Sequence, residues 1–172
     1  MHFDLPIQQL LRRKGTRFQF GFAKEARTMV PEGDEFVLAA SQKGLHVLAK
    51  NEDALQMPVE ALREVYGPHL EVQPPEVRVI EGARVREPIM HVRISTQTRF
   101  LDAVKSALLH RGASAAGEYV RSNYCVLHYE APLAELLGLP AELKKLAGEK
   151  AKYWVVLSHY AVVDRDPGGR AA

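Results

Sequence analysis

The second half of the chain carries the most regular alternation of apolar and polar positions. Met90, Val92 and Ile94 are separated by polar side chains, and this period of two predicts a strand over 89–96 with one side against a core. Further strands are expected at 118–121, 124–130 and 152–163, and helices at about 98–112 and 132–148, the second broken near Gly138. The order strand, helix, strand, strand, helix, strand is that of the split βαβ, or ferredoxin-like, unit.

The first half has a weaker pattern of the same kind. A helix is predicted at 5–13, with Pro6 in its first turn, and a strand at 17–22, where three phenylalanines alternate with other residues. A hairpin of strands is expected at 35–41 and 45–50, then a helix opened by Pro58, a strand at 69–72 and an edge segment at 77–80. Charged residues interrupt the apolar pattern at 81–87, so we expect two units, 1–81 and 82–172. The expected fold class is α+β, two ferredoxin-like units in tandem, each an antiparallel sheet with helices on one face.

Composition narrows the classes of protein without naming one. Apolar residues make up 47% of the 172 residues and charged residues 26%, as in ordinary globular proteins. The net charge of +2 excludes a strongly basic nucleic-acid coat but leaves room for local patches. Cys125 is the only cysteine, which excludes an internal disulfide and suits a reducing compartment, and its alternation with Leu127 predicts that it is buried. No signal peptide or membrane-spanning run is recognisable, so the expected location is the cytoplasm.

Three segments in the second half, in this order, resemble domain V of elongation factor G. They are EPIMHV at 87–92, APLAELLG at 131–138 and SHYAVV at 158–163, where the family reads roughly E-P-I-M-x-V, V-P-L-x-E-M-F-G and H-Y-x-x-V. Arg111 and Gly112 stand where the family carries R-R-G. The first half resembles domain III of the same family through GLHV at 44–47, ALREVYG at 61–67 and PEVRV at 75–79. Segment 23–34 looks too short for the first helix of domain III, so we expect either a trimmed unit or one in which the helix at 5–13 covers the gap.

The absence of a phosphate-binding motif narrows the function that this resemblance implies. The sequence has no match to the phosphate-binding pattern G-x-x-x-x-G-K-[ST], so we expect no nucleotide binding, no cofactor and no enzymatic activity. The resemblance implies a non-enzymatic accessory protein associated with the ribosome or its RNA. The alternative is a protein–protein adaptor or homodimeric module on the same scaffold, without RNA binding. Before the last strand the family has a glycine-rich loop, whereas this chain has KKLAGEKA at 144–151.

Basic side chains gather on and beside the two helices expected in the second unit. Both helices of a ferredoxin-like unit cover one side of the sheet, so these cations form a candidate ridge for phosphate groups of RNA. A solvated helix surface is the other interpretation, and the sequence leaves both open. The candidate RNA-binding residues are Arg99, Lys105, Arg111, Lys144, Lys145, Lys150 and Lys152.

The other side of the same sheet should carry Trp and Val in a row, which is unusual for a surface left to water. We therefore expect this side to be covered by the first unit, a second copy of the chain or a partner. The candidate protein-interface residues are His91, Arg93, Val126, His128, Trp154, Val156 and Tyr160.

The histidines offer little evidence of a metal site or a catalytic group. His91 and His128 should be neighbours on adjacent strands, but zinc needs three or four ligands, so no metal site is expected. His159 is expected to point into the core. Ser158 and His159 are adjacent on a strand and should face opposite sides, which excludes them as a nucleophile and its base.

Overall fold

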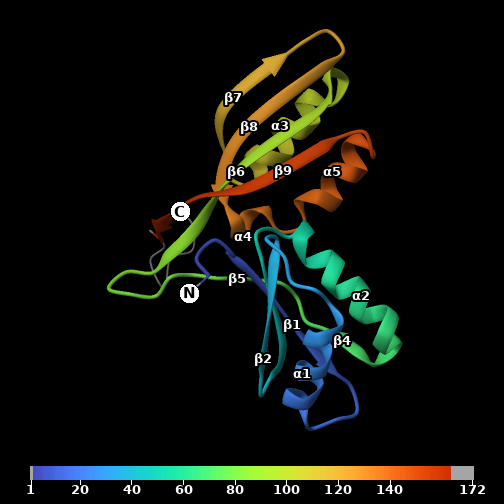
Figure 1. Cartoon of the computed structure of the whole chain (residues 1–172). Helices are drawn as coiled ribbons and strands as arrows, with labels where there is room; N and C mark the ends of the chain where they lie inside the picture. The colour runs from blue at the N-terminus through green and yellow to red at the C-terminus, as the bar shows by residue number, and fades with distance from the viewer. Residues whose placement is uncertain (1, 164–172) are drawn as a thin grey trace.

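The computed structural model describes residues 2–163, which form two antiparallel sheets with helices packed on them (Figure 1). The first sheet and its helices come from the first half of the chain, and the second from the other half. Segment 78–85 joins the last strand of the first sheet to the first strand of the second. The expected boundary after Glu81 falls inside this segment, and we propose it as the division between the units.

The first unit has every element of the split βαβ order. Its strands are β1 (Ile7–Arg13), β2 (Phe36–Ser41), β3 (Gly44–Ala49), β4 (Leu70–Val72) and β5 (Glu76–Val77), and its helices are α1 (Gln19–Met29) and α2 (Gln56–Tyr66), with short 3-10 turns η1 (Asp53–Leu55) and η2 (Gly67–His69). The sheet order is β2-β3-β1-β4, and β5 also pairs with β1. The unit therefore has all the elements of the split βαβ order, and its description as a trimmed domain III-like unit stays a prediction.

Two elements of the first unit differ from the sequence prediction. The expected helix at 5–13 is wrong, because residues 7–13 form β1, which pairs with β3 on one side and with β4 and β5 on the other. The expected strand at 17–22 is also wrong, because α1 begins at Gln19. The buried Gln19 side chain bonds both backbone groups of Arg13 and the carbonyl of Thr16, and so closes the turn into the helix.

The second unit has the predicted order of elements. It contains β6 (Arg86–Gln97), η3 (Thr98–Phe100), α3 (Leu101–His110), β7 (Ser114–Val120), β8 (Tyr124–Pro132), α4 (Leu133–Leu136), α5 (Leu139–Ala147) and β9 (Lys152–Val162). The sheet order β7-β8-β6-β9 repeats that of the first unit. The prediction of two tandem ferredoxin-like units is confirmed.

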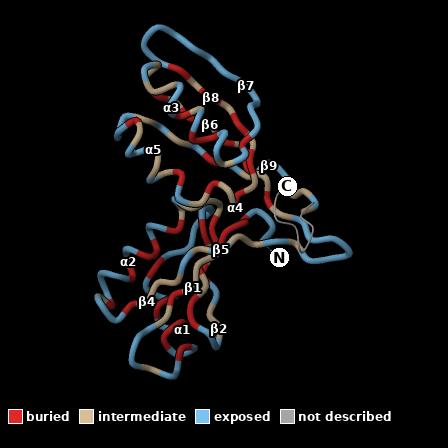
Figure 2. Tube along the Cα trace, turned by 180° about the vertical axis from the view of Figure 1, so that it is seen from behind, coloured by how far each residue is buried: buried red, intermediate tan, exposed pale blue. Residues whose placement is uncertain are grey.

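The core of the second unit follows the alternation seen in the sequence. Met90, Val92 and Ile94 of β6 are fully or almost fully buried, and so is Leu108 of α3. Cys125 is also buried, as predicted. By contrast, β7 is exposed along its whole length (Figure 2). The sheet therefore has one side under α3 and α5 and one side that no helix of the second unit covers.

A β-bulge changes the faces of the last strand. Met90 pairs with Leu157 but Ile89 pairs with His159, so Ser158 is the extra residue. Beyond the bulge the alternation is reversed, and His159 lies on the side of Ile89, exposed to solvent. The expectation of a core histidine is wrong for this reason.

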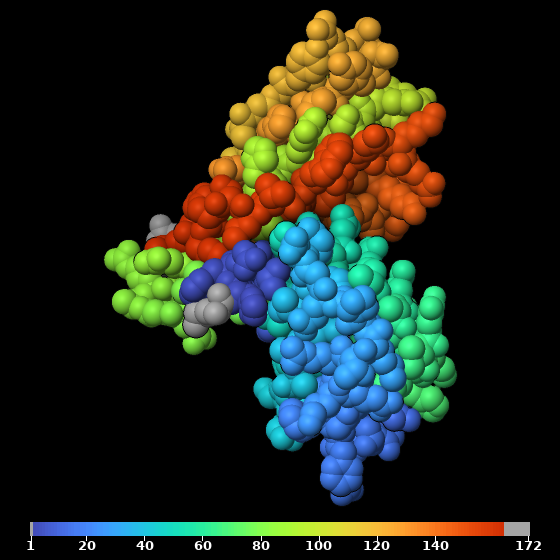
Figure 3. All heavy atoms as spheres, in the orientation of Figure 1, coloured from blue at the N-terminus to red at the C-terminus, as the bar shows by residue number. Residues whose placement is uncertain are grey.

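The two units meet along β9 and the turn between α4 and α5 (Figure 3). The Asn51 side chain donates a hydrogen bond to the Val155 carbonyl at 3.1 Å, and the Gly138 amide donates to the Glu52 carboxylate at 3.0 Å. Gly138 has a φ of +81°, which a glycine adopts without strain. This conformation breaks the helix, as predicted.

Candidate functional site

Arg111, one of the candidate RNA-binding residues, is engaged inside the second unit. Its guanidinium donates two hydrogen bonds to Glu142, at 3.0 and 2.6 Å, and two to the carbonyls of Glu135 and Leu137, at 2.8 and 2.9 Å. It thereby ties the end of α3 to the turn between α4 and α5. A guanidinium that uses its donors in this way has little left for a phosphate group.

Two further cations of the proposed ridge have partners within the chain. Lys105 forms an ion pair with Glu118 of β7 at 2.9 Å. The guanidinium carbon of Arg99 lies 4.6 Å from the centre of the Phe100 ring and stays exposed. The structure therefore leaves Arg99 accessible and partly satisfies Lys105.

The lysines near the end of α5 are the most accessible cations on the helix side. Lys145 and Lys150 are exposed, and within residues 2–163 neither has a carboxylate at ion-pair distance. Lys144 pairs with Glu149 at 3.3 Å, but the two side chains are 67% and 84% exposed. Surface pairs of this kind contribute little stability, so water or another anion can replace Glu149.

Lys152 belongs to the opposite side of the sheet. It pairs with Ser95, whose neighbours Ile94 and Thr96 point into the core, so Lys152 lies on the side without helices. Its expected place on the helix-side ridge is wrong, because β9 begins at this residue and its alternation decides the side.

We call this uncovered side of the second sheet the open sheet face. Strand pairing places Arg93 of β6 beside Trp154 of β9, and the guanidinium carbon lies 5.0 Å from the centre of the Trp154 ring. Trp154 is 45% exposed and Val156 is 58% exposed. The pairing places His91, Val126 and His128 on the same face, as expected. Their predicted role as a protein interface stays a prediction.

His91 and His128 are neighbours, as the strand order predicted. Nε2 of His91 and Nδ1 of His128 are 3.2 Å apart. Within residues 2–163 no group of three histidine, cysteine or carboxylate side chains is arranged to hold a metal ion. The pair therefore lacks the further ligands that a zinc site needs.

Tyr160 is the one expected member of the open sheet face that lies elsewhere. It follows the bulge and pairs with the buried Pro88, so it points to the other side, and its placement on the open face is wrong. Its hydroxyl donates a hydrogen bond to the Phe3 carbonyl at 2.7 Å, and burial raises its pKa. Tyr160 thus joins the two units within the chain.

The bulge also brings Ser158 and His159 together, contrary to the sequence prediction. Ser158 Oγ lies 3.0 Å from His159 Nδ1 and 3.2 Å from a carboxylate oxygen of Glu130. Both Ser158 and His159 are exposed, and neither lines the cleft described next. The two side chains therefore lie close together at the bulge, outside the cleft between the units.

A cleft of about 630 Å³ opens where the two units meet. Phe36 and Met57 line it from the first unit, and Trp154 and Val156 from the second. Asn51, whose side chain donates a hydrogen bond to the Val155 carbonyl of β9, also lines the cleft. The open sheet face therefore borders the cleft along β9, and Trp154 and Val156 stay exposed there.

Sequence reasoning missed three residues of the open sheet face. Tyr119 pairs with Val126, and the Arg121 amide bonds the Tyr124 carbonyl in the hairpin turn, so all three side chains share the face. Tyr119 and Tyr124 are each 44% exposed, with ring centres 6.1 Å apart. The alternation of β8 around Val126 was the signal that could have found Tyr124.

The comparisons with known proteins identify the family that the second unit resembles. A family model described as elongation factor G C-terminus matches residues 84–170. Elongation factor G 2 of Hahella chejuensis (strain KCTC 2396) is 33% identical over 78 residues, which are 45% of this chain and 12% of that protein. Elongation factor G of Ruegeria sp. (strain TM1040) is 27% identical over 85 residues, 49% of this chain and 12% of that protein. The match therefore spans about an eighth of the length of these relatives.

A solved structure extends the likeness in fold to nearly the whole chain. The crystal structure of ttk003000868 from Thermus thermophilus matches 92% of this chain with a TM-score of 0.66 and 16% identity, and the match covers 41% of that chain. The family model covers half of the present sequence and contains all four strands of the second sheet. This chain belongs to the elongation factor G C-terminus family.

Proposed function

We propose that this protein is a non-enzymatic accessory protein that binds ribosomes, in the cytoplasm, through RNA contacts on the helix side of its second unit. Family membership supports a translation-related role for that unit. The observation that carries the proposal is the accessible group Lys144, Lys145 and Lys150, at the end of α5 and in the loop before β9. These cations stand where the sequence replaces the family's glycine-rich loop.

The physical argument is electrostatic. A Lys ammonium group that approaches a phosphate displaces condensed counterions, and the affinity then falls as salt is added. Lys144 and Lys145 also lie in the last turn of α5, where cations favourably oppose the helix dipole. Stabilising the helix and binding RNA are compatible, because an exposed ammonium keeps two or three hydrogen-bond donors for a ligand.

Sedimentation with ribosomes through a sucrose cushion at two salt concentrations tests the proposal. Three phosphate contacts predict a log–log salt dependence with a slope of about −2 to −3. The triple variant Lys144→Glu, Lys145→Glu, Lys150→Glu should remain folded and lose this part of the affinity. A matched control reverses Lys14, Arg17 and Lys24, three exposed cations of the first unit, and should bind as the wild type does. Wild-type sedimentation of the α5 triple variant, or none of the wild type at low salt, would refute the proposal.

A further inference from the structure

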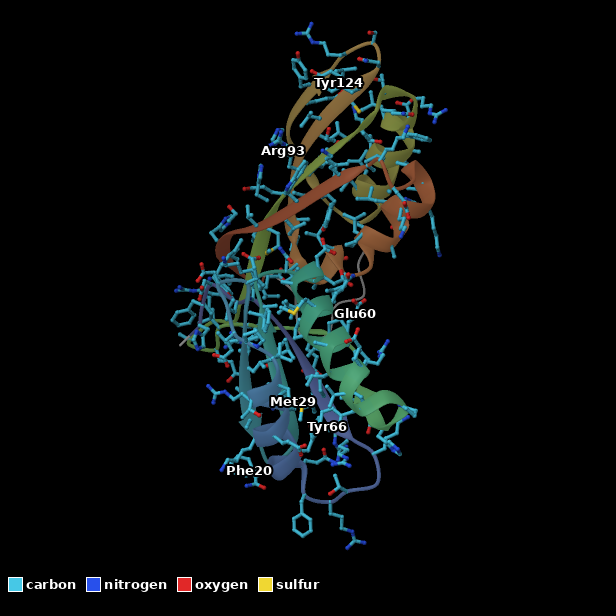
Figure 4. The ribbon with its side chains drawn as sticks, turned by 45° about the vertical axis from the view of Figure 1, so that its right-hand side comes forward. Phe20, Met29, Glu60, Tyr66, Arg93 and Tyr124 are labelled. Carbon is cyan, nitrogen blue, oxygen red and sulfur yellow. The ribbon has the colours of Figure 1, made fainter. Side chains whose placement is uncertain are left out.

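We propose that the open sheet face binds single-stranded nucleic acid by stacking bases on its exposed aromatic rings. This site is separate from the helix-side lysines, so the proposal does not depend on ribosome binding. Two ring-and-guanidinium groups mark the face, one on β9 and β6 and one at the β7–β8 hairpin. Figure 4 shows Arg93 and Tyr124, one residue from each group, on the same side of the second unit.

Trp154 provides the first stacking position. The guanidinium carbon of Arg93 lies over the Trp154 ring, 5.0 Å from its centre. Trp154 nevertheless stays 45% exposed. Lys152 precedes it by two residues on the same side of β9. An indole with an adjacent guanidinium offers a base both π-stacking and cation–π attraction, and Lys152 offers a charge to the phosphate.

Tyr119 and Tyr124 provide the second position. Each ring is 44% exposed, and the guanidinium carbon of Arg121 lies 5.0 Å from the centre of the Tyr119 ring. The hairpin turn between β7 and β8 holds the three side chains on one face. The arrangement repeats that of Arg93 and Trp154 on the opposite edge of the sheet.

Small side chains lie between the two positions: Ser95 and Val126 pair with each other, and with Lys152 and Tyr119 on the outer strands. His128 pairs with Arg93 beside them, and its ring nitrogen lies 3.2 Å from that of His91, which is further from the hairpin. Gly117 pairs with His128 on β7, and a Cβ at Gly117 would come within 3.8 Å of the His128 Cβ, so the glycine leaves that side of the histidine uncovered. A strand spacing of about 4.8 Å sets the two outer strands about 14 Å apart. Four-stranded RNA-binding sheets of the RRM type stack two or three bases on aromatic side chains of the sheet, and here Trp154 and Tyr119 lie on the two outer strands.

Charge favours a nucleic acid over a protein as the occupant. Arg93, Arg121 and Lys152 are exposed at the end of the face that carries the rings. The carboxylates of Glu87 and Glu130 lie toward the other end of the strands, and Glu130 accepts a hydrogen bond from Ser158. Cores of protein interfaces are depleted in charge, whereas grooves for single strands combine cations with stacking rings.

Titration of the full chain with oligo(U) and oligo(dT) of about ten nucleotides tests the inference. Because Trp154 is the only tryptophan, stacking should quench its fluorescence directly. We expect Trp154→Ala, followed by anisotropy of a labelled oligonucleotide, to weaken binding about 5- to 100-fold, and Arg93→Glu to weaken it as well. Three cations predict a log–log salt slope of about −2 for a single strand. A duplex of the same length should bind more weakly, since its bases are already stacked.

Phe18→Ala and Lys24→Glu are matched controls on the first unit, where Phe18 is 83% exposed, and should leave the affinity unchanged. Circular dichroism establishes that each variant is folded, and Lys152→Glu replaces Trp154→Ala should the latter fail to fold. Three results overturn the inference: no saturable quenching at low salt, equal affinity for duplex and single strand, or unchanged affinity in the open-face variants. A dimer that dissociates in Trp154→Ala also overturns it, because the face would then be a protein interface. No ribosome is present, so failure here leaves the proposed function standing.

Discussion

Arg111→Lys should destabilise the second unit although it keeps the positive charge. The guanidinium of Arg111 donates two hydrogen bonds to Glu142 and one each to the carbonyls of Glu135 and Leu137. A lysine ammonium is a single point and cannot reproduce this fork between a carboxylate and two carbonyls. The variant therefore loses the two-point contact and leaves at least one of these acceptors without its donor.

The expected loss is about 2 kcal/mol in the free energy of unfolding. Hydrogen bonds to charged groups are worth about 1.5–3 kcal/mol each, and removing one partner of a fully buried pair costs about 3–5 kcal/mol. The side chains of Arg111 and Glu142 are 22% and 39% exposed, so water replaces part of the lost interaction and lowers the figure. Urea unfolding followed by circular dichroism measures the change.

A double-mutant cycle with Glu142→Gln separates the pair from its surroundings. We expect a coupling energy of about 1 kcal/mol or more between the two positions, because they are in direct contact. Arg99→Lys is the matched control, since within residues 2–163 the structure shows Arg99 in contact only with its neighbouring Phe100 ring, and it should change stability by less than about 0.5 kcal/mol. Equal stability of Arg111→Lys and the wild type would show that the four hydrogen bonds do not hold the α3 and α5 ends together.

Two further predictions concern groups whose pKa is raised by full or partial burial. Burial raises the pKa of Glu52, so the folded state holds its proton more tightly than the unfolded chain does, and this carboxyl lowers stability as pH rises from about 4.3 through the raised value. Glu52→Gln, which keeps an acceptor for the Gly138 amide, should gain stability relative to the wild type over that window in urea unfolding. Burial also raises the pKa of the Cys125 thiol, so an aromatic disulfide reagent should modify Cys125 only in denaturant, as absorbance at native and denaturing conditions would show.

The sequence predicted the second unit well because its alternation is unambiguous. Polar and apolar positions alternate from Met90 to Ile94, and the structure buries the apolar side. In the first unit, Gln, Leu and Arg dominate residues 7–13, and these residues form helices readily. Residues 7–13 form a strand because they pair with strands on both sides, and a local sequence pattern does not reveal such pairing. Phe18 and Phe20 led to the wrong prediction of a strand at 17–22. Both are exposed, Phe18 in the turn before α1 and Phe20 on α1 itself.

The candidate site was harder to predict because it depends on partners distant in sequence. Nothing local in the sequence shows that Arg111 reaches Glu142, 31 positions away, or that Glu118 engages Lys105. The pattern of apolar and polar residues also does not reveal the bulge at Ser158, which places Tyr160 on the side opposite the open sheet face. The open face itself followed from alternation alone for Arg93 and Trp154, since no bulge separates them from the start of β9.

The two proposed binding surfaces should act independently, because they lie on opposite sides of one sheet. Lys144 and Lys145 belong to α5, which covers the core side, while Trp154 lies on the side without helices. Changes at separated sites without shared partners usually add within about 0.5 kcal/mol. A saturating single-stranded oligonucleotide should therefore leave ribosome sedimentation unchanged, and combining Trp154→Ala with the α5 triple variant should reproduce the sum of the two effects on each ligand. Displacement of the protein from ribosomes by the oligonucleotide would contradict this, and would mean that the ribosome occupies the open sheet face rather than the helix side.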